Sequence, residues 1–223
     1  MRAKSLLVIV LGVMAVLGYY TWFQPFNSKA ATADITASGV VSSGISITAT
    51  SGAVSLGTLN GFTGAAGSAD AEWTVKTNNT AGYELKVNKN HKFYKSPGGA
   101  GKEFDDYIAA GAPTYDWSVA TDARKFGFVL KTLGASVLPV QRYLNDNTNC
   151  DIAFFSGGTF TSSKCWDSVP DTATTIASRS AATDTSGVAT TITLKAEIGS
   201  PSTGGYLESG SYDTIITGTA LTL

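Results

Sequence analysis

The clearest alternation of apolar and polar positions in this chain runs from residue 71 to residue 87. Its apolar positions fall on alternate residues of two runs: Trp73, Val75 and Thr77, then Tyr83, Leu85 and Val87. A period of two residues is typical of a strand with one face packed on a core and the other face exposed to water. The residues between the runs, 78–82 (NNTAG), are turn formers, and Gly82 can adopt a positive φ. We therefore expect a β-hairpin.

Similar β-prone runs recur along the rest of the chain: 35–41, 45–50, 54–59, 125–131, 187–198 and 212–223. In the run 125–131 the apolar face is Phe126, Phe128 and Leu130, and residues 137–144 are its expected partner strand. With about nine to eleven strands and no convincing helix, the pattern predicts an all-β fold, an antiparallel immunoglobulin-like β-sandwich. Only 15% of residues are charged, against about 25% in ordinary soluble domains, which suits a surface-exposed β protein.

The N-terminus predicts export. Arg2 and Lys4 precede an uncharged apolar run, 6–23, and Ala31-Thr32-Ala33 fits a signal-peptidase site. Residues 1–33 are therefore a signal peptide or, if uncleaved, a membrane anchor held by residues 6–23. Either alternative places the remainder, residues 34–223, at the cell surface or in the extracellular space. We expect that remainder to be a single β-sandwich domain with a loop-rich insertion around 145–186.

The charge balance of residues 34–223 argues against nucleic acid as a partner. Residues 1–33 hold Arg2, Lys4 and Lys29, which leaves 13 basic against 17 acidic residues and a net charge of −4. A nucleic-acid-binding domain usually carries a basic stripe instead.

The two cysteines, Cys150 and Cys165, are expected to form a disulfide, because the predicted compartment is oxidising. Closing this loop contributes about 3 kcal/mol in the chain-entropy model. Two cysteines and one distant histidine make a poor ligand set for a metal, so we expect no metal and no cofactor.

No catalytic constellation stands out. His91 is the single histidine and lies in a polar run, so a catalytic triad would depend on it. The glycine-rich run 98–102 lacks the spacing of a phosphate-binding loop. A hydrolase would have to use Asp105, Asp106 or Asp116, and their spacing is not diagnostic. We expect that the chain is not an enzyme.

Three aromatic residues, Tyr115, Trp117 and Trp166, are placed in or near predicted loops. Aromatic rings presented by loops can stack on sugar rings, and they can equally close the ends of a sandwich. A carbohydrate-binding surface module, with glycans as partners, is therefore the alternative function.

The two ends of the predicted domain suggest assembly. Residues 214–223 hold no charge and no proline, and the run 34–50 is uncharged after Asp34. Left at an open edge, such strands invite pairing with another chain, which is β-strand addition. The alternative is that both runs pair within one fold.

Two stretches carry a family resemblance. The stretch W-T-V…TNN…GY-x-L, from Trp73 to Leu85, resembles the same hairpin of exported bacterial β-sandwich proteins, and is loosely similar to wall-binding WxL domains, although Val75 replaces the leucine. Residues 210–216 (GSYDTII) resemble the closing strand of spore-coat-U and fimbrial-type subunits. The resemblance implies an immunoglobulin-like sandwich that assembles by strand exchange, and it assigns no functional residue.

Taken together, these observations predict a secreted or cell-surface structural or adhesive protein, such as a pilus-like filament subunit. Its expected partners are other copies of itself or components of the cell envelope.

Overall fold

The computed structural model describes residues 38–60, 64–99, 101–108, 111–200 and 207–223. The chain divides into two units, Met1–Val41 and Ser42–Leu223, and all strands found among the described residues belong to the second. The predicted signal peptide or anchor, residues 1–33, lies outside the described residues. Within the ranges just given, no helix has the length and apolar character needed to cross a membrane.

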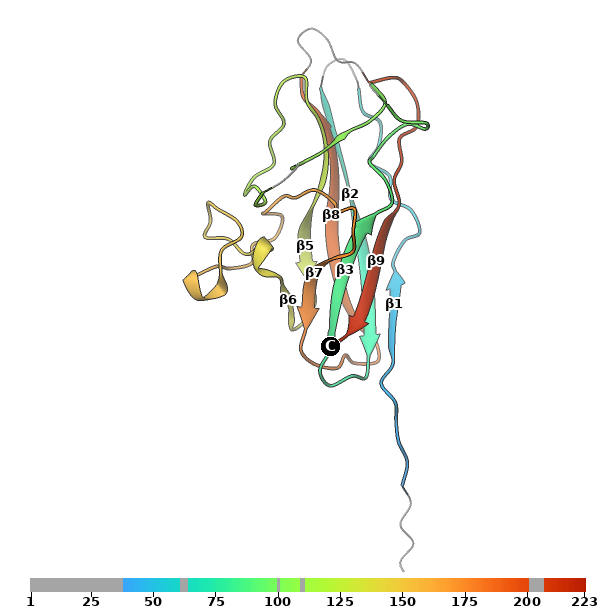
Figure 1. Cartoon of the computed structure of the whole chain (residues 1–223), viewed down its shortest axis with the longest axis vertical. Coiled ribbons are helices and arrows are strands. Elements are labelled where there is room, and N and C mark those ends of the chain that lie inside the picture. Colours follow the sequence, from blue (N-terminus) through green and yellow to red (C-terminus); the bar gives the residue numbers. More distant parts are fainter. Residues whose placement is uncertain (1–37, 61–63, 100, 109–110, 201–206) are drawn as a thin grey trace, which may run out of the picture. The chain divides into compact units, whose positions relative to one another are not determined.

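The larger of two sheets contains five strands in the order β1-β2-β8-β5-β4 (Figure 1). Their bounds are β1 Ile45–Ala49, β2 Ala65–Thr77, β8 Val188–Ile198, β5 Arg124–Leu133 and β4 Asp105–Asp106. All neighbours in this sheet run antiparallel except the short β4, which is parallel to β5.

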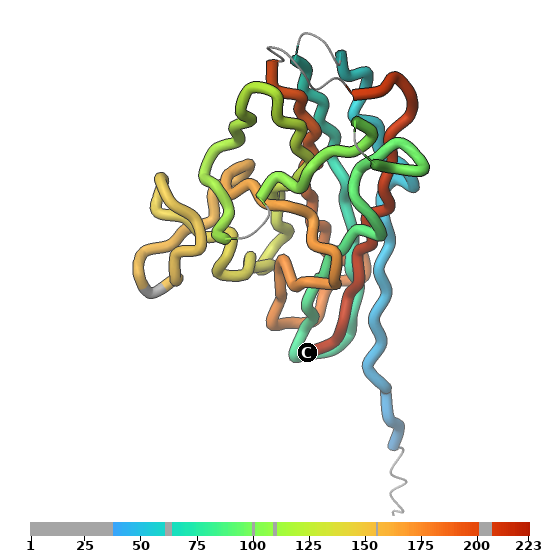
Figure 2. The backbone as a smooth tube through the Cα atoms, turned by 45° about the horizontal axis from the view of Figure 1, so that its top comes forward, coloured from blue at the N-terminus to red at the C-terminus, as the bar shows by residue number. Residues whose placement is uncertain are grey.

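The smaller sheet contains four antiparallel strands in the order β6-β7-β3-β9. Their bounds are β6 Val137–Pro139, β7 Thr174–Arg179, β3 Tyr83–Lys89 and β9 Ile216–Thr222. Two 3-10 turns, η1 Gln141–Tyr143 and η2 Phe154–Ser156, interrupt the long connection between β6 and β7. Figure 2 shows this connection projecting beside the sheets.

One hydrophobic core joins the two sheets. Alternate residues of β8 are buried along its whole length, and the larger sheet also contributes Val75 and Phe128. The smaller sheet contributes Leu85, Val87 and Ile176 to the same cluster. The prediction of a nearly all-β chain with antiparallel sheets is therefore confirmed.

The hairpin prediction for residues 71–87 is wrong. β2 pairs with β1 and β8, whereas β3 pairs with β7 and β9, so the two runs belong to different sheets. Trp73 and Tyr83 are both core residues, contributed from opposite sides. Alternation shows which face of a strand is buried. It looks the same whether two strands pair in one sheet or lie in two sheets that face each other, so it could not identify the pairing. The turn 78–82 therefore carries the chain from one sheet to the other.

The partner predicted for the strand at 125–131 is also wrong. β6 pairs with β7 of the smaller sheet, and β5 pairs with β8. The expected face of β5 is buried, but so is Val129 on its opposite face, which packs against Tyr107 and Trp166. A loop cluster thus covers the outer face of the larger sheet at β5.

Candidate functional site

β9 forms one edge of the smaller sheet, and β3 is its one hydrogen-bonded neighbour among the described strands. Leu223 donates its backbone N–H to Gly82 at 3.2 Å, and Asn90 donates to Ile215 at 3.1 Å. In an antiparallel ladder these contacts mean that odd-numbered residues of β9 point their backbone groups at β3. The residues whose backbone groups point away from β3 are Ile216, Gly218, Ala220 and Thr222.

Across the described residues, no backbone hydrogen bond reaches that outer edge of β9. β1 lies beside β9 but is hydrogen-bonded to β2 instead (Figures 1 and 2). β9 also approaches β2 closely, because a Cβ added at Gly218 would lie 2.5 Å from Nε1 of Trp73. The strand is thus packed on the core through one face while its outer backbone edge stays unpaired.

The described residues that precede β1, 38–44, form no strand. Val40 and Val41 are 98% and 88% exposed, the highest values among the large apolar side chains described. The two valines are adjacent and lie in an uncharged, β-prone run, so their side chains are free to pack against another surface.

The predicted disulfide is confirmed: Cys150 and Cys165 are bonded, with their Cα atoms 5.6 Å apart. Both cysteines are buried and belong to the main hydrophobic core. Asn145 forms isolated bridges with Cys150 and Thr159, so the closed loop folds back on the end of η1. The bond therefore ties the long β6–β7 connection to the core.

Replacing both cysteines with serine is expected to lower the free energy of unfolding by about 3 kcal/mol. The disulfide joins residues 15 positions apart, and closing a loop of this length lowers the entropy of the unfolded chain by that amount of free energy. Urea unfolding with and without reductant measures the loss. Reductant should destabilise the wild-type protein to a similar extent and leave the double variant unchanged. A double variant as stable as the wild type would contradict the expectation.

Trp117 and Trp166, two of the predicted sugar-stacking aromatics, lie in one cluster. The Trp117 ring stacks on Tyr107 at 4.0 Å between centroids, and it meets Trp166 edge-on at 4.9 Å. Its Nε1 donates to Glu197 at 2.7 Å, and the ammonium of Lys195 lies 4.9 Å from its centroid. Because Tyr107 stacks on Trp117 and the Lys195 ammonium lies over the same ring, a sugar would have to displace one of these side chains. Glycan binding stays a prediction.

Tyr115 is separated from these two tryptophans in the packing. Its half-buried ring contacts the main core, and the ammonium of Lys164 lies 4.5 Å above it. Lys164 also pairs with Asp116 at 2.5 Å. The three predicted aromatics therefore contribute to two different clusters.

The acidic residues considered for hydrolysis have different neighbours. Asp106 lies 2.9 Å from Nζ of Lys89, Asp116 pairs with Lys164, and Asp105 is exposed at the start of β4. His91 places Nδ1 2.7 Å from the carbonyl oxygen of Lys92. In the part of the chain that the structure describes, no three His, Cys, Asp or Glu residues gather as metal ligands would.

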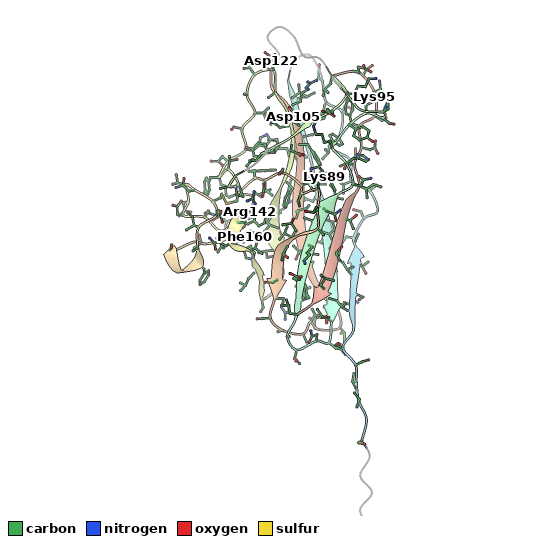
Figure 3. All side chains as sticks on the ribbon, in the orientation of Figure 1. Lys89, Lys95, Asp105, Asp122, Arg142 and Phe160 are labelled. Atoms are coloured by element: carbon green, nitrogen blue, oxygen red, sulfur yellow. A yellow bond between two sulfur atoms is a disulfide. The ribbon has the colours of Figure 1, made fainter. Side chains whose placement is uncertain are left out.

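Two buried charged groups were missed by sequence reasoning. Lys89 continues the alternation of Tyr83, Leu85 and Val87, and a lysine in the core-facing phase is a signal that was available in the sequence. Asp167 is buried beside Arg142, whose Nε and Nη2 donate to its two carboxylate oxygens at 2.5 and 3.0 Å (Arg142 is labelled in Figure 3). No sequence pattern connects those two residues.

The pKa values around Asp167 follow from this packing. The hydrogen bond to Asp167 raises the pKa of the Arg142 guanidinium above its usual value. Burial, reinforced by the nearby Asp167 carboxylate, raises the pKa of Tyr143 well above that of an exposed tyrosine. Arg142 also donates to the carbonyl oxygen of Gly111 at 2.8 Å. The arrangement is that of a structural ion pair.

Compared with models of known protein families and with curated protein sequences, the chain matches none. The candidate sites are therefore judged by their geometry alone.

Proposed function

We propose that this chain is an exported structural protein of the cell surface, without catalytic activity, whose immunoglobulin-like sandwich assembles with other copies by β-strand addition. The observation that carries the proposal is the unpaired outer edge of β9. The buried disulfide suits an extracellular location, because disulfides persist in oxidising compartments.

Soluble proteins usually protect an open edge strand from other chains. They place lysine or proline on it, shorten it, or bend it with a bulge. β9 has none of these features: it is seven residues long, contains no charge and no proline, and pairs with β3 without a shift of register. Leu221 and Leu223 add exposed apolar side chains at its end. Such an edge can receive a strand through backbone hydrogen bonds.

The proposed occupant is the N-terminal segment of another copy, residues 35–44. In sequence it is uncharged and β-prone, and its described part exposes Val40 and Val41. Its arrival requires β1 to move aside from β9. β1 is a five-residue edge strand whose ladder hydrogen bonds go to β2 alone among the described strands, so it can leave β9 without breaking a bond to that strand.

Replacing Ala220 with proline is expected to abolish assembly while leaving the fold intact. The N–H of Ala220 points to the outer edge, so proline removes a donor that an incoming strand needs and spares the ladder with β3. Light scattering and electron microscopy of concentrated protein spanning residues 34–223 measure assembly. Circular dichroism measures the fold.

Ala220→Ser is the matched control, because it changes the side chain at the same position and keeps the backbone N–H that points to the outer edge. This variant should still assemble. Wild-type protein that stays monomeric at every concentration would overturn the proposal of assembly. Normal assembly of Ala220→Pro would overturn the assignment to β9.

A further inference from the structure

Lys89 occupies an unusual position for a lysine, at the core-facing end of β3 with a side chain that is 1% exposed (Figure 3). Its Nζ lies 2.9 Å from Oδ1 of Asp106 and 3.0 Å from Oδ1 of Asp171, and it donates to the carbonyl oxygen of Val169 at 2.5 Å. The amine and the two carboxyl groups come from separate segments that the fold brings together.

The two carboxyl groups differ in their surroundings. Asp106 belongs to β4 of the larger sheet, and its side chain is 25% exposed. Asp171 lies in the connection before β7, and its side chain is 76% exposed. Asp106 is therefore a partly desolvated partner for the amine, whereas the Asp171 carboxylate is in contact with water.

We propose that Lys89 and Asp106 form an intramolecular amide bond that joins the two sheets covalently. The reaction needs a neutral amine and a neutral carboxylic acid, which the transfer of one proton from Nζ to the adjacent Asp106 carboxylate produces. Holding a nucleophile against a carbonyl carbon removes most of the entropic barrier to their reaction. The amide carries no charge, so it suits this buried position better than the ion pair does.

The reaction balances without any additional reagent. One Nζ proton first passes to the Asp106 carboxylate. The Nζ lone pair of the resulting amine then attacks Cγ of Asp106 to form the C–N bond, and Asp171 accepts a second proton from Nζ. The C–O bond to the Asp106 hydroxyl then breaks, and that hydroxyl leaves as water with the proton that Asp171 returns. One ammonium and one carboxylate thus become one amide and one water, and no atom is oxidised or reduced.

The alternative state is a permanent ion pair, in which the three Nζ protons are satisfied by Asp106, Asp171 and Val169. The two states differ by the mass of one water, so mass spectrometry of the purified wild-type protein distinguishes them. The intact chain should be lighter than its sequence mass by one water, in addition to the two hydrogens lost in the disulfide.

Tryptic digestion locates the bond. We expect peptides 87–92 and 103–124 to appear fused, with one water missing and with no cleavage after Lys89, because trypsin does not cleave after an acylated lysine. Separate peptides ending at Lys89 and spanning 103–124, each at its sequence mass, would overturn the proposal. The fused peptide also separates this bond from the loss of water in a cyclised aspartate, which joins no two peptides.

Lys89→Arg keeps the positive charge and its hydrogen bonds, but a guanidinium does not acylate under these conditions, so this variant should show no loss of water. The matched control is Lys131→Arg at the exposed Lys131–Asp70 ion pair, which should retain the loss and the fused peptide. Asp171→Asn should slow the appearance of the fused peptide, because it removes the proton carrier. A fused peptide in Lys89→Arg, or its absence from Lys131→Arg, would contradict the assignment. The cross-link does not depend on assembly through β9, and either can fail alone.

Discussion

Gly82→Ala is expected to lower the free energy of unfolding by about 3 kcal/mol or more, because it combines backbone strain with a steric overlap. Gly82 has a φ of +90°, which alone costs an L-residue about 1–2 kcal/mol. An added Cβ would also overlap the carbonyl oxygen of Arg179 and lie 2.7 Å from the backbone nitrogen of Ala181. Neither group can move without disturbing the end of β7. Chemical denaturation followed by tryptophan fluorescence measures the loss.

Gly99→Ala is the matched control for strain without overlap. Gly99 has a φ of +111°, and no atom lies within 4 Å of the position its Cβ would occupy. We expect a loss of about 1 kcal/mol at this exposed loop. Equal losses at the two glycines would show that the approach of β7 to residue 82 is not a constraint on the fold.

Arg142→Met is expected to lower the free energy of unfolding by about 2–4 kcal/mol. The change leaves the carboxylate of Asp167, whose side chain is 4% exposed, without its cationic partner. The backbone N–H of Ser168, which donates at 2.8 Å, compensates for part of the loss. Because the Arg142 side chain is 36% exposed, water can reach the ion pair from the arginine side. The expected loss of stability is therefore smaller than for a fully buried ion pair.

Lys131→Met, at an ion pair whose side chains are 44% and 43% exposed, is the comparison and should cost about 0–1 kcal/mol. Adding Asp167→Asn to Arg142→Met should recover part of the loss, because no charge then remains buried. If Arg142→Met were as stable as Lys131→Met, another donor or water would have to satisfy Asp167.

The sequence predicted burial better than it predicted pairing. The alternation along residues 187–198 identified the core face of β8, because each side chain of a strand must choose between core and water. The same alternation left the partners of β2 and β3 undetermined. The choice between a hairpin and a crossing between sheets depends on the path of residues 78–82 and on strands far away in the chain.

The candidate sites show the same division. The disulfide could be predicted from the expected oxidising compartment and the presence of two cysteines. The absence of charge in the last strand could be read directly from its residues. That β9 lies at an edge could not be predicted, because strand order results from contacts among distant segments. The neighbours of Lys89 were hidden for the same reason, since Asp106 and Asp171 lie on segments far from it in sequence.

The order in which the strands of the smaller sheet leave the ribosome has a consequence for how this chain folds. Tyr83 of β3 pairs with Arg179 of β7 on one side and with Thr222 of β9 on the other. Both neighbours of β3 are therefore translated long after it, β9 later than β7. Non-local pairing of this kind forms slowly. The smaller sheet thus cannot close until β7 and β9 have both been translated, so the chain stays incompletely folded through most of its synthesis.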